Sequence, residues 1–250
     1  MSGNLILRIR QSVRRFLEPH VFATPLQVEQ GEWKFYLDYL REGMVAFDVG
    51  AHVGELTLLF SKFVGAKGQV HAFEASSASF KRLQTACVVS GRSNIVLHNV
   101  ALADREGMVK LHVYDHDHLS WSSLADRPLH KYGIPIRPAG TEEVPATTVD
   151  AFCDKHAVFR IDLLKIDVEG AEYQVLLGAR RMLQEKRIRC CVFEFGATTF
   201  DMGNSPDAIE EYLAGFGYAL RNIVSGDPVF PGRRSAETAR FSMHVAMPES

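Results

Sequence analysis

The stretch "FDVGAHVGEL", residues 47–56, decides the fold class, because it joins a short apolar strand to a helix through a tight turn that carries an acid. The strand is "MVAFDVG", and "GELTLLFSKFVG" follows it with the pattern of a helix. Gly50 lets the chain turn and lets backbone approach a ligand, and Gly54 lets the helix pack closely. The two glycines are spaced GxxxG, which differs from the GxGxxG of dinucleotide-binding turns.

The alternation of strand and helix continues along the chain with one interruption. Before the interruption, a strand, a helix and a strand are predicted in turn for "GQVHAFEAS", "SASFKRLQTACVVSG" and "NIVLHNVAL". After it, the strands are "FRIDLLKIDVEG" and "RCCVFEFG", and each is followed by a helix, "AEYQVLLGARRMLQEK" and "SPDAIEEYLAGFG". This alternation predicts an α/β fold, a mostly parallel sheet with crossover helices. The last stretches, "YALRNI" and "FSMHVAM", predict a pair of antiparallel closing strands.

Two segments depart from this alternation. Residues 1–42 are predicted to form a helical extension, with a basic amphipathic helix over 5–17 and a second helix over 29–41. The first of these helices either docks on the domain, which we favour, or rests on an anionic membrane surface. In the remaining domain, 43–250, an insert over about 104–145 begins with a hairpin predicted to turn at Arg105–Gly107 and continues as a polar, irregular segment. Such inserts usually serve function.

The composition excludes several classes of protein. A hydrophobic content of 46% and a charged content of 23% over 250 residues are typical of one globular domain. The formal net charge of −2 gives no reason to expect nucleic acid as a partner. The sequence shows no apolar run of membrane-spanning length and predicts no signal peptide. The four cysteines form no CxxC pair, so we expect reduced core thiols in a cytoplasmic protein.

Acids at two successive strand ends indicate the ligand. Ligands of open parallel sheets bind at the carboxyl ends of the strands. Asp48, beside the glycine turn, would repel a pyrophosphate but favour an ammonium or a sulfonium, and S-adenosylmethionine carries both. Glu74 ends the second strand and can accept hydrogen bonds from both ribose hydroxyls. The plainer alternatives are that Asp48 only caps the next helix and that Glu74 is a solvated strand end.

The end of the third strand, Asn99–Ala101, is expected near the adenine, although plain strand packing explains it equally well. The stretch "LLKIDVEGAEYQVLLGA", residues 163–179, adds carboxylates at the methyl end of the cofactor. Lys165, Asp167 and Glu169 follow at period two, and Glu172 falls in the first turn of a helix, where an acid suits the helix dipole. A Lys165–Asp167 ion pair with helix capping is the alternative.

Several of these stretches, taken in order, resemble the FkbM family of S-adenosylmethionine-dependent methyltransferases: "FDVGAHVGELTL", "VHAFEAS", "NVALAD", "WSSL", "VPATTVD", "LLKIDVEGAEYQVLLGA" and "FEF". The similarity covers roughly residues 30–200, and "KIDVEGAE" is its most specific part. The resemblance implies a class I methyltransferase fold, which is Rossmann-like with a seven-stranded sheet. It also implies O-methylation of a hydroxyl on sugars, polyketides or other secondary metabolites. His52 departs from the family, which often has a small polar residue there.

The expected cofactor site is Asp48, Gly50, Ala51, His52, Gly54, Glu74, Ala75, Ser76, Asn99, Ala101 and Asp167. An acceptor hydroxyl benefits from a base, and we expect Asp167 or Glu169 to serve, ahead of His52 and the run "DHDH", Asp115–His118. We expect no metal, because neighbours on an extended strand point in opposite directions. An NAD-dependent oxidoreductase, a non-catalytic cofactor-binding protein and a membrane-surface adaptor are the alternatives. The oligomeric state is left open.

Overall fold

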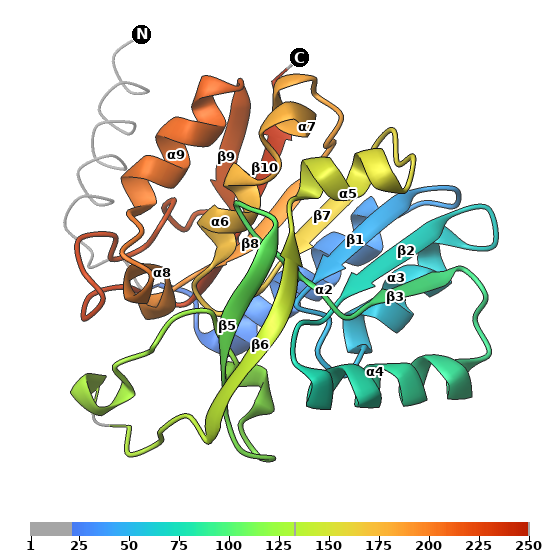
Figure 1. Ribbon diagram of the computed structural model, residues 1–250. Helices are drawn as coiled ribbons and strands as arrows, with labels where there is room; N and C mark the ends of the chain where they lie inside the picture. The colour runs from blue at the N-terminus through green and yellow to red at the C-terminus, as the bar shows by residue number, and fades with distance from the viewer. Residues whose placement is uncertain (1–21, 133, 250) are drawn as a thin grey trace, which may run out of the picture.

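A seven-stranded sheet with helices on both faces forms the body of the computed structural model, which describes residues 22–132 and 134–249 (Figure 1). The strands lie in the order β3-β2-β1-β7-β8-β10-β9. All neighbours pair in parallel except β10, which is antiparallel to β8 and to β9. The predicted fold class, with its antiparallel closing strand, is confirmed. The strands are β1 Val45–Val49, β2 Gln69–Phe73, β3 Ile95–His98, β7 Leu163–Ile166, β8 Cys191–Phe195, β9 Tyr218–Asn222 and β10 Ser242–Pro248.

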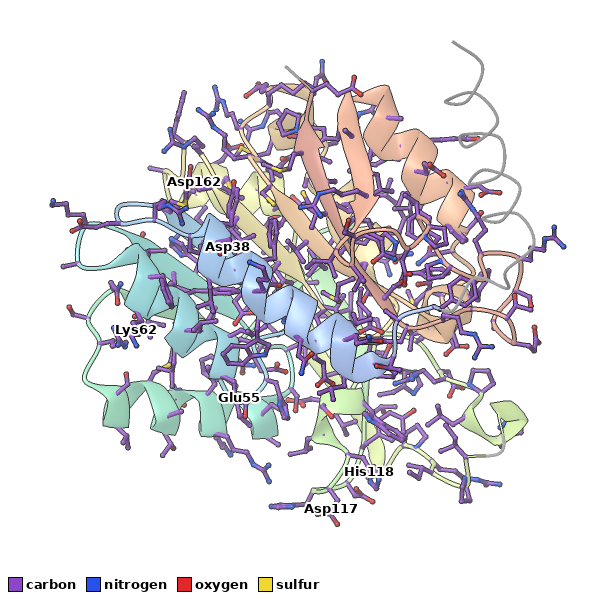
Figure 2. All side chains as sticks on the ribbon, turned by 180° about the vertical axis from the view of Figure 1, so that it is seen from behind. Asp38, Glu55, Lys62, Asp117, His118 and Asp162 are labelled. Atoms are coloured by element: carbon purple, nitrogen blue, oxygen red, sulfur yellow. The ribbon has the colours of Figure 1, made fainter. Side chains whose placement is uncertain are left out.

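Alternating side chains of the central strands fill two cores, one on each face of the sheet. Ala46 of β1 packs toward α2 and α3, whereas its neighbour Phe47 packs toward α5, α6, α7 and α9. Figure 2 shows α2, α3 and α4 together on the back face. Complete burial of a side chain as large as Phe47 stabilises the fold by about 1.5–3 kcal/mol. The helices are α2 Pro25–Tyr39, α3 Glu55–Val64, α4 Ser77–Ser90, α5 Val149–Lys155, α6 Glu172–Leu177, α7 Arg180–Gln184, α8 Ala197–Asp201 and α9 Pro206–Gly215.

The helix predicted over 29–41 is present as α2, and it begins earlier. Thr24 caps it by accepting a hydrogen bond from the Gln27 amide, and Pro25 occupies its first turn, where a missing N–H costs nothing. Tyr36 of this helix is fully buried against the sheet. The helix predicted over 5–17 lies outside the described residues, and the boundary between residues 42 and 43 stays a prediction.

The prediction of a hairpin that turns at Arg105–Gly107 is wrong. Its two arms, β4 (Ala101–Leu102) and β5 (Gly107–Val113), do not pair with each other. Both pair with β6 (Gly140–Thr147), which lies between them in a second, three-stranded sheet. Strand β6 was not predicted from the sequence, because Pro145 and a pair of glutamates interrupt its apolar pattern. Its Val144 nevertheless packs in the core of this small sheet. Part of the irregular insert is therefore a strand.

Two further predictions change, and two short helices are new. The third strand stops at His98, because Asn99 turns aside and its side-chain amide donates to the Glu74 and Ala75 carbonyls. The long helix predicted over 171–186 breaks into α6 and α7 at Gly178, which packs so closely on the Ala103 carbonyl that a Cβ would lie 2.1 Å from it. The short helices α5 and α8 were not predicted from the sequence.

The insert also contains two short 3-10 helices, η1 (Leu119–Trp121) and η2 (Leu129–Tyr132). All four cysteines are buried and free, which confirms the prediction of core thiols. Over the residues that the structure describes, no helix has both the length and the apolar character needed to cross a membrane. The cytoplasmic location stays a prediction.

Candidate active site

A pocket lies at the carboxyl ends of β1, β2 and β7, where the fold is expected to bind its ligand. The strand ends form one wall and the insert forms the other. The residues that line it are Val49, Gly50, His52, Phe73, Glu74, Ala75, Val100, Ala101, Leu102, Leu111, Leu119, Ser120, Ser122, Leu124, Asp167, Val168, Glu169 and Ala171.

The turn after β1 is held tightly against the neighbouring strand ends. The amides of Gly50 and Ala51 both donate to the Phe73 carbonyl at the end of β2. Gly50 has a φ of +79°, and a Cβ there would lie 1.8 Å from the Asp167 carbonyl oxygen, so only glycine fits. His52 has a φ of +49°, an uncommon value for a residue with a side chain. Burial, with Arg82 nearby, lowers the pKa of its imidazole.

Asp48, which we expected to serve the cofactor amine, does not line the pocket. Its side chain is fully buried behind the turn, where it accepts a hydrogen bond of 2.6 Å from the Thr57 hydroxyl. Its other oxygen lies 3.2 Å from Lys165 Nζ. That ammonium also donates to the Gly50 carbonyl and lies 3.5 Å from Asp167 Oδ2. Asp48 thus binds the lysine that supports the turn, and this Lys165–Asp167 contact is the ion pair that we considered as an alternative.

Burial alone would lower the pKa of Lys165, but the carboxylates of Asp48 and Asp167 outweigh it and hold that pKa above its ordinary value. The lysine is therefore charged at neutral pH. It balances two acids at once, which leaves an excess of negative charge at this edge of the sheet.

Glu74 lines the pocket, as predicted, and both of its carboxylate oxygens accept backbone hydrogen bonds of 2.8 Å, from His52 and from Ser76. Burial raises the pKa of Glu74 to about 7, against the opposing effect of these two bonds. Ser76 caps α4 with its hydroxyl. Of the predicted cofactor residues, those that line the pocket are Gly50, His52, Glu74, Ala75, Ala101 and Asp167. The others do not line it: Asp48, Ala51, Gly54 and Ser76 are buried, and Asn99 is exposed.

The turn after β7 brings both predicted bases to the pocket, in different surroundings. The side chain of Asp167 is 39% exposed and lines the pocket. Glu169 has a φ of +56°, and its carboxylate lies 2.9 Å from Arg127 Nη1. Burial raises the pKa of Glu169 to about 7, and Arg127 opposes that rise. Glu172, at the start of α6, accepts the amides of Val168 and Gly170 and so closes the turn.

Sequence reasoning missed three residues that contribute to this site. Glu194, in "FEF" of β8, forms a side-chain hydrogen bond with Asp167; burial, together with the charges of Asp167 and Glu169, raises its pKa well above the ordinary value. An acid inside an apolar strand is an available signal for it. Arg127 and Ser123 of the insert contact Glu169; Ser123 lies in the stretch "WSSL", whereas no local pattern marks Arg127.

The run Asp115–His118 lies at the outer end of the insert, and Figure 2 shows Asp117 and His118 there. His118 Nδ1 lies 2.6 Å from Asp115 Oδ1, whereas His116 and Asp117 are largely exposed. Between residues 22 and 132 and between 134 and 249, no group of three or more His, Cys, Asp or Glu side chains is arranged to hold a metal ion. Catalysis without metal stays a prediction.

Comparison with known proteins agrees with this geometry. A sequence model of the methyltransferase FkbM domain matches residues 48–220. The 31-O-demethyl-FK506 methyltransferase FkbM of Streptomyces tacrolimicus is 25% identical over 266 residues, which cover 95% of this chain and 94% of that protein. The protein-L-isoaspartate O-methyltransferase of Triticum aestivum is 28% identical over 141 residues, which cover 52% and 54% of the two chains.

Two solved structures share the fold. Methyltransferase FkbM from Methylobacillus flagellatus KT superposes with a TM-score of 0.50 at 15% identity, over 85% of this chain and 50% of that chain. A Streptococcus mutans protein described as a methyltransferase, in complex with SAH, gives a TM-score of 0.50 at 9% identity, over 91% and 99%. The chain thus spans about half the length of the wheat and M. flagellatus proteins. It belongs to the FkbM family of S-adenosylmethionine-dependent methyltransferases, and not to the NAD-dependent oxidoreductases that share its βα opening.

Proposed function

We propose that this protein transfers the methyl group of S-adenosylmethionine to a hydroxyl oxygen of an uncharged small molecule, with Asp167 as the base. The observation that carries the proposal is the charge of the pocket. Among the described residues that line it, the acidic side chains are Glu74, Asp167 and Glu169, and none is a lysine or an arginine.

The lining fits the cofactor. S-adenosylmethionine supplies, when bound, a methyl group already activated for displacement at a sulfonium. An acidic pocket favours its positive charges. Glu74 would accept the ribose hydroxyls, because each of its oxygens has capacity left after one backbone hydrogen bond. Ala101 and Leu124 belong to the apolar part of the lining, which suits a purine ring. Gly50 provides room where a Cβ would clash.

The same charge selects the acceptor. A phosphate or a carboxylate would face three acids, and the two cations that contact these acids, Lys165 and Arg127, do not line the pocket, so an anionic acceptor is disfavoured and a polyol or macrolide hydroxyl is favoured. For the same reason we expect no nucleic acid in this pocket. The names of both curated relatives specify an oxygen as the methylated atom, in 31-O-demethyl-FK506 and in an O-methyltransferase. The second name gives isoaspartate, an acid, so it supports transfer to oxygen and not the choice of an uncharged acceptor.

Asp167 suits the role of base better than Glu169. A general base needs a free lone pair within reach of the proton that it takes. Arg127 binds the Glu169 carboxylate at 2.9 Å, whereas Asp167 is partly exposed to the pocket and its charge is balanced by Lys165 from behind. Asp167 would therefore accept the proton of the acceptor hydroxyl, and Lys165 would hold its carboxylate in place.

The test is methyl transfer from methyl-labelled S-adenosylmethionine to matched acceptors: a macrolide or sugar with a free hydroxyl, its deoxy analogue and its phosphorylated derivative. We expect label only in the first, in a product stable to mild alkali, as an ether is. An alkali-labile product would indicate a methyl ester and contradict the hydroxyl acceptor. Transfer to none of a broad set of acceptors, by protein that binds the cofactor, would support the non-catalytic alternative.

A further inference from the structure

The insert forms one wall of the pocket, and a cluster of buried charges fixes that wall in place. Arg127 of the insert directs Nη1 to Glu169 Oε2 at 2.9 Å and Nε to Asp201 Oδ2 at 3.7 Å. The three side chains are 11%, 20% and 2% exposed. They come from the insert, from the turn after β7 and from the last residue of α8. One guanidinium therefore joins three segments that lie far apart in the sequence.

A second contact fixes the same part of the insert to the same turn. The Ser123 hydroxyl donates to the Glu169 carbonyl at 2.7 Å. The backbone of Ser123 also exchanges hydrogen bonds of 2.8 and 3.1 Å with His112 of β5. Residues on either side of a bridged position point the opposite way, and Ser122 and Leu124 do line the pocket.

Arg127 also contacts the part of the insert that precedes Ser123. Its guanidinium carbon lies 5.9 Å from the centre of the Trp121 ring, and Nη1 lies 3.5 Å from the Trp121 carbonyl. Trp121 ends η1, which presents Leu119 and Ser120 to the pocket. Both pocket-lining parts of the insert loop are thus held by contacts of Arg127 or of its partner Glu169.

Removing charges from water costs desolvation energy, and apolar side chains packed in the same place are often as stabilising as a buried ion pair. We therefore explain this buried cluster by the position in which it holds the insert, and not by its contribution to stability. We propose that Arg127 is a positioning residue that, through Glu169 and Asp201, holds the insert wall closed on the pocket and so sets how long the cofactor stays bound. On this assignment Glu169 is also a positioning residue. The inference rests on the proposed function only in taking this pocket as the site of methyl transfer.

The test compares Arg127→Lys with Asp126→Asn, a matched control on the neighbouring side chain, which is 82% exposed. Lysine keeps the charge but cannot direct one N–H group to Glu169 and another to Asp201, as the planar guanidinium does. We expect the dissociation constant of S-adenosylhomocysteine to rise by about tenfold, mostly through faster dissociation, because a hydrogen bond to a charged group is lost. Amide hydrogens over 119–125 should exchange faster in Arg127→Lys, while Asp126→Asn should match the parent protein in both measurements.

A second variant separates positioning from proton transfer and guards against misfolding of the first. Glu169→Gln keeps an oxygen that can accept from Arg127 but loses the charge. Positioning predicts weaker binding of S-adenosylhomocysteine and faster exchange over 119–125, with a small change in kcat. If Glu169 is instead the base, kcat should fall strongly while binding and exchange stay unchanged. That result overturns the inference, and so does an Arg127→Lys protein that behaves like the parent. The binding and exchange measurements use no acceptor, so they are independent of whether the methyl goes to a hydroxyl, and only the comparison of kcat needs one.

Discussion

Replacing Glu74 by glutamine removes the negative charge at the end of β2 with the smallest change of shape. The residue is 9% exposed, and its two oxygens accept the amides of His52 and Ser76 at 2.8 Å each. Glutamine offers one oxygen and one NH2 group, so a donor would face one of these amides. The variant therefore loses one structural hydrogen bond and the charge available to the ribose hydroxyls.

The expected magnitude follows from these contacts. A hydrogen bond to a charged group is worth about 1.5–3 kcal/mol, so the affinity for S-adenosylhomocysteine should fall by about tenfold to a hundredfold. The pH dependence of this affinity also has an expected direction. Burial raises the pKa of Glu74 to about 7, and the ribose hydroxyls donate, so they prefer the ionised carboxylate. Below pH 7 the parent protein must release a proton to bind, and its affinity should fall by up to about tenfold for each pH unit.

The assay is calorimetric titration with S-adenosylhomocysteine between about pH 5.5 and 8, with the parent, Glu74→Gln and Glu172→Gln proteins. Glu172 is a matched control, because it is buried, its pKa is raised by burial to about 7 and it accepts two backbone amides, but it does not line the pocket. Groups such as His52 titrate in all three proteins, so differences between them isolate the glutamates.

We expect Glu74→Gln to bind weakly and to lose part of the pH slope. Glu172→Gln should keep the affinity and the slope of the parent, whatever it loses in thermal stability. The reasoning fails if Glu74→Gln binds like the parent at every pH, or if Glu172→Gln loses as much affinity as Glu74→Gln.

Three other perturbations test the rest of the site and the core. Asp167→Asn should lower kcat by about a hundredfold or more, because it removes the proton acceptor, and should lower the affinity for S-adenosylhomocysteine much less. Lys165→Met leaves the buried charge of Asp48 unpaired and should lower the free energy of unfolding, measured in urea, by about 3–5 kcal/mol. Burial lowers the pKa values of His71 and His98 to about 4, so protons favour the unfolded chain as the pH falls from about 6.5 toward 4. His98→Phe should therefore gain thermal stability relative to the parent over that interval, and a difference that is constant with pH would contradict this.

Local pattern predicted the parts of the fold that adjacent segments determine. Each βα unit is short, and its strand and helix have distinct periodicities, so the sheet and the converging strand ends followed from the sequence. The middle strand of the small sheet did not, because β6 is separated from β5 by a long loop and carries Pro145 in an otherwise weak pattern. The contact of Arg127 with Glu169 crosses 42 positions, and no local periodicity encodes such a pair.

Asp48 shows how an inference about charge can rest on the wrong atoms. The sequence suggested that an acid beside the glycine turn would attract a cationic ligand, yet in the structure Lys165 faces Asp48 from the adjacent strand, in direct register. That ammonium is shared with Asp167, so one positive charge stands against two negative charges. Glu74, in the same pocket, has no lysine or arginine among its hydrogen-bond partners. The excess of acid that favours a sulfonium therefore persists at the strand ends, but it is carried by the pocket-lining acids, while Asp48 anchors the lysine that supports Gly50.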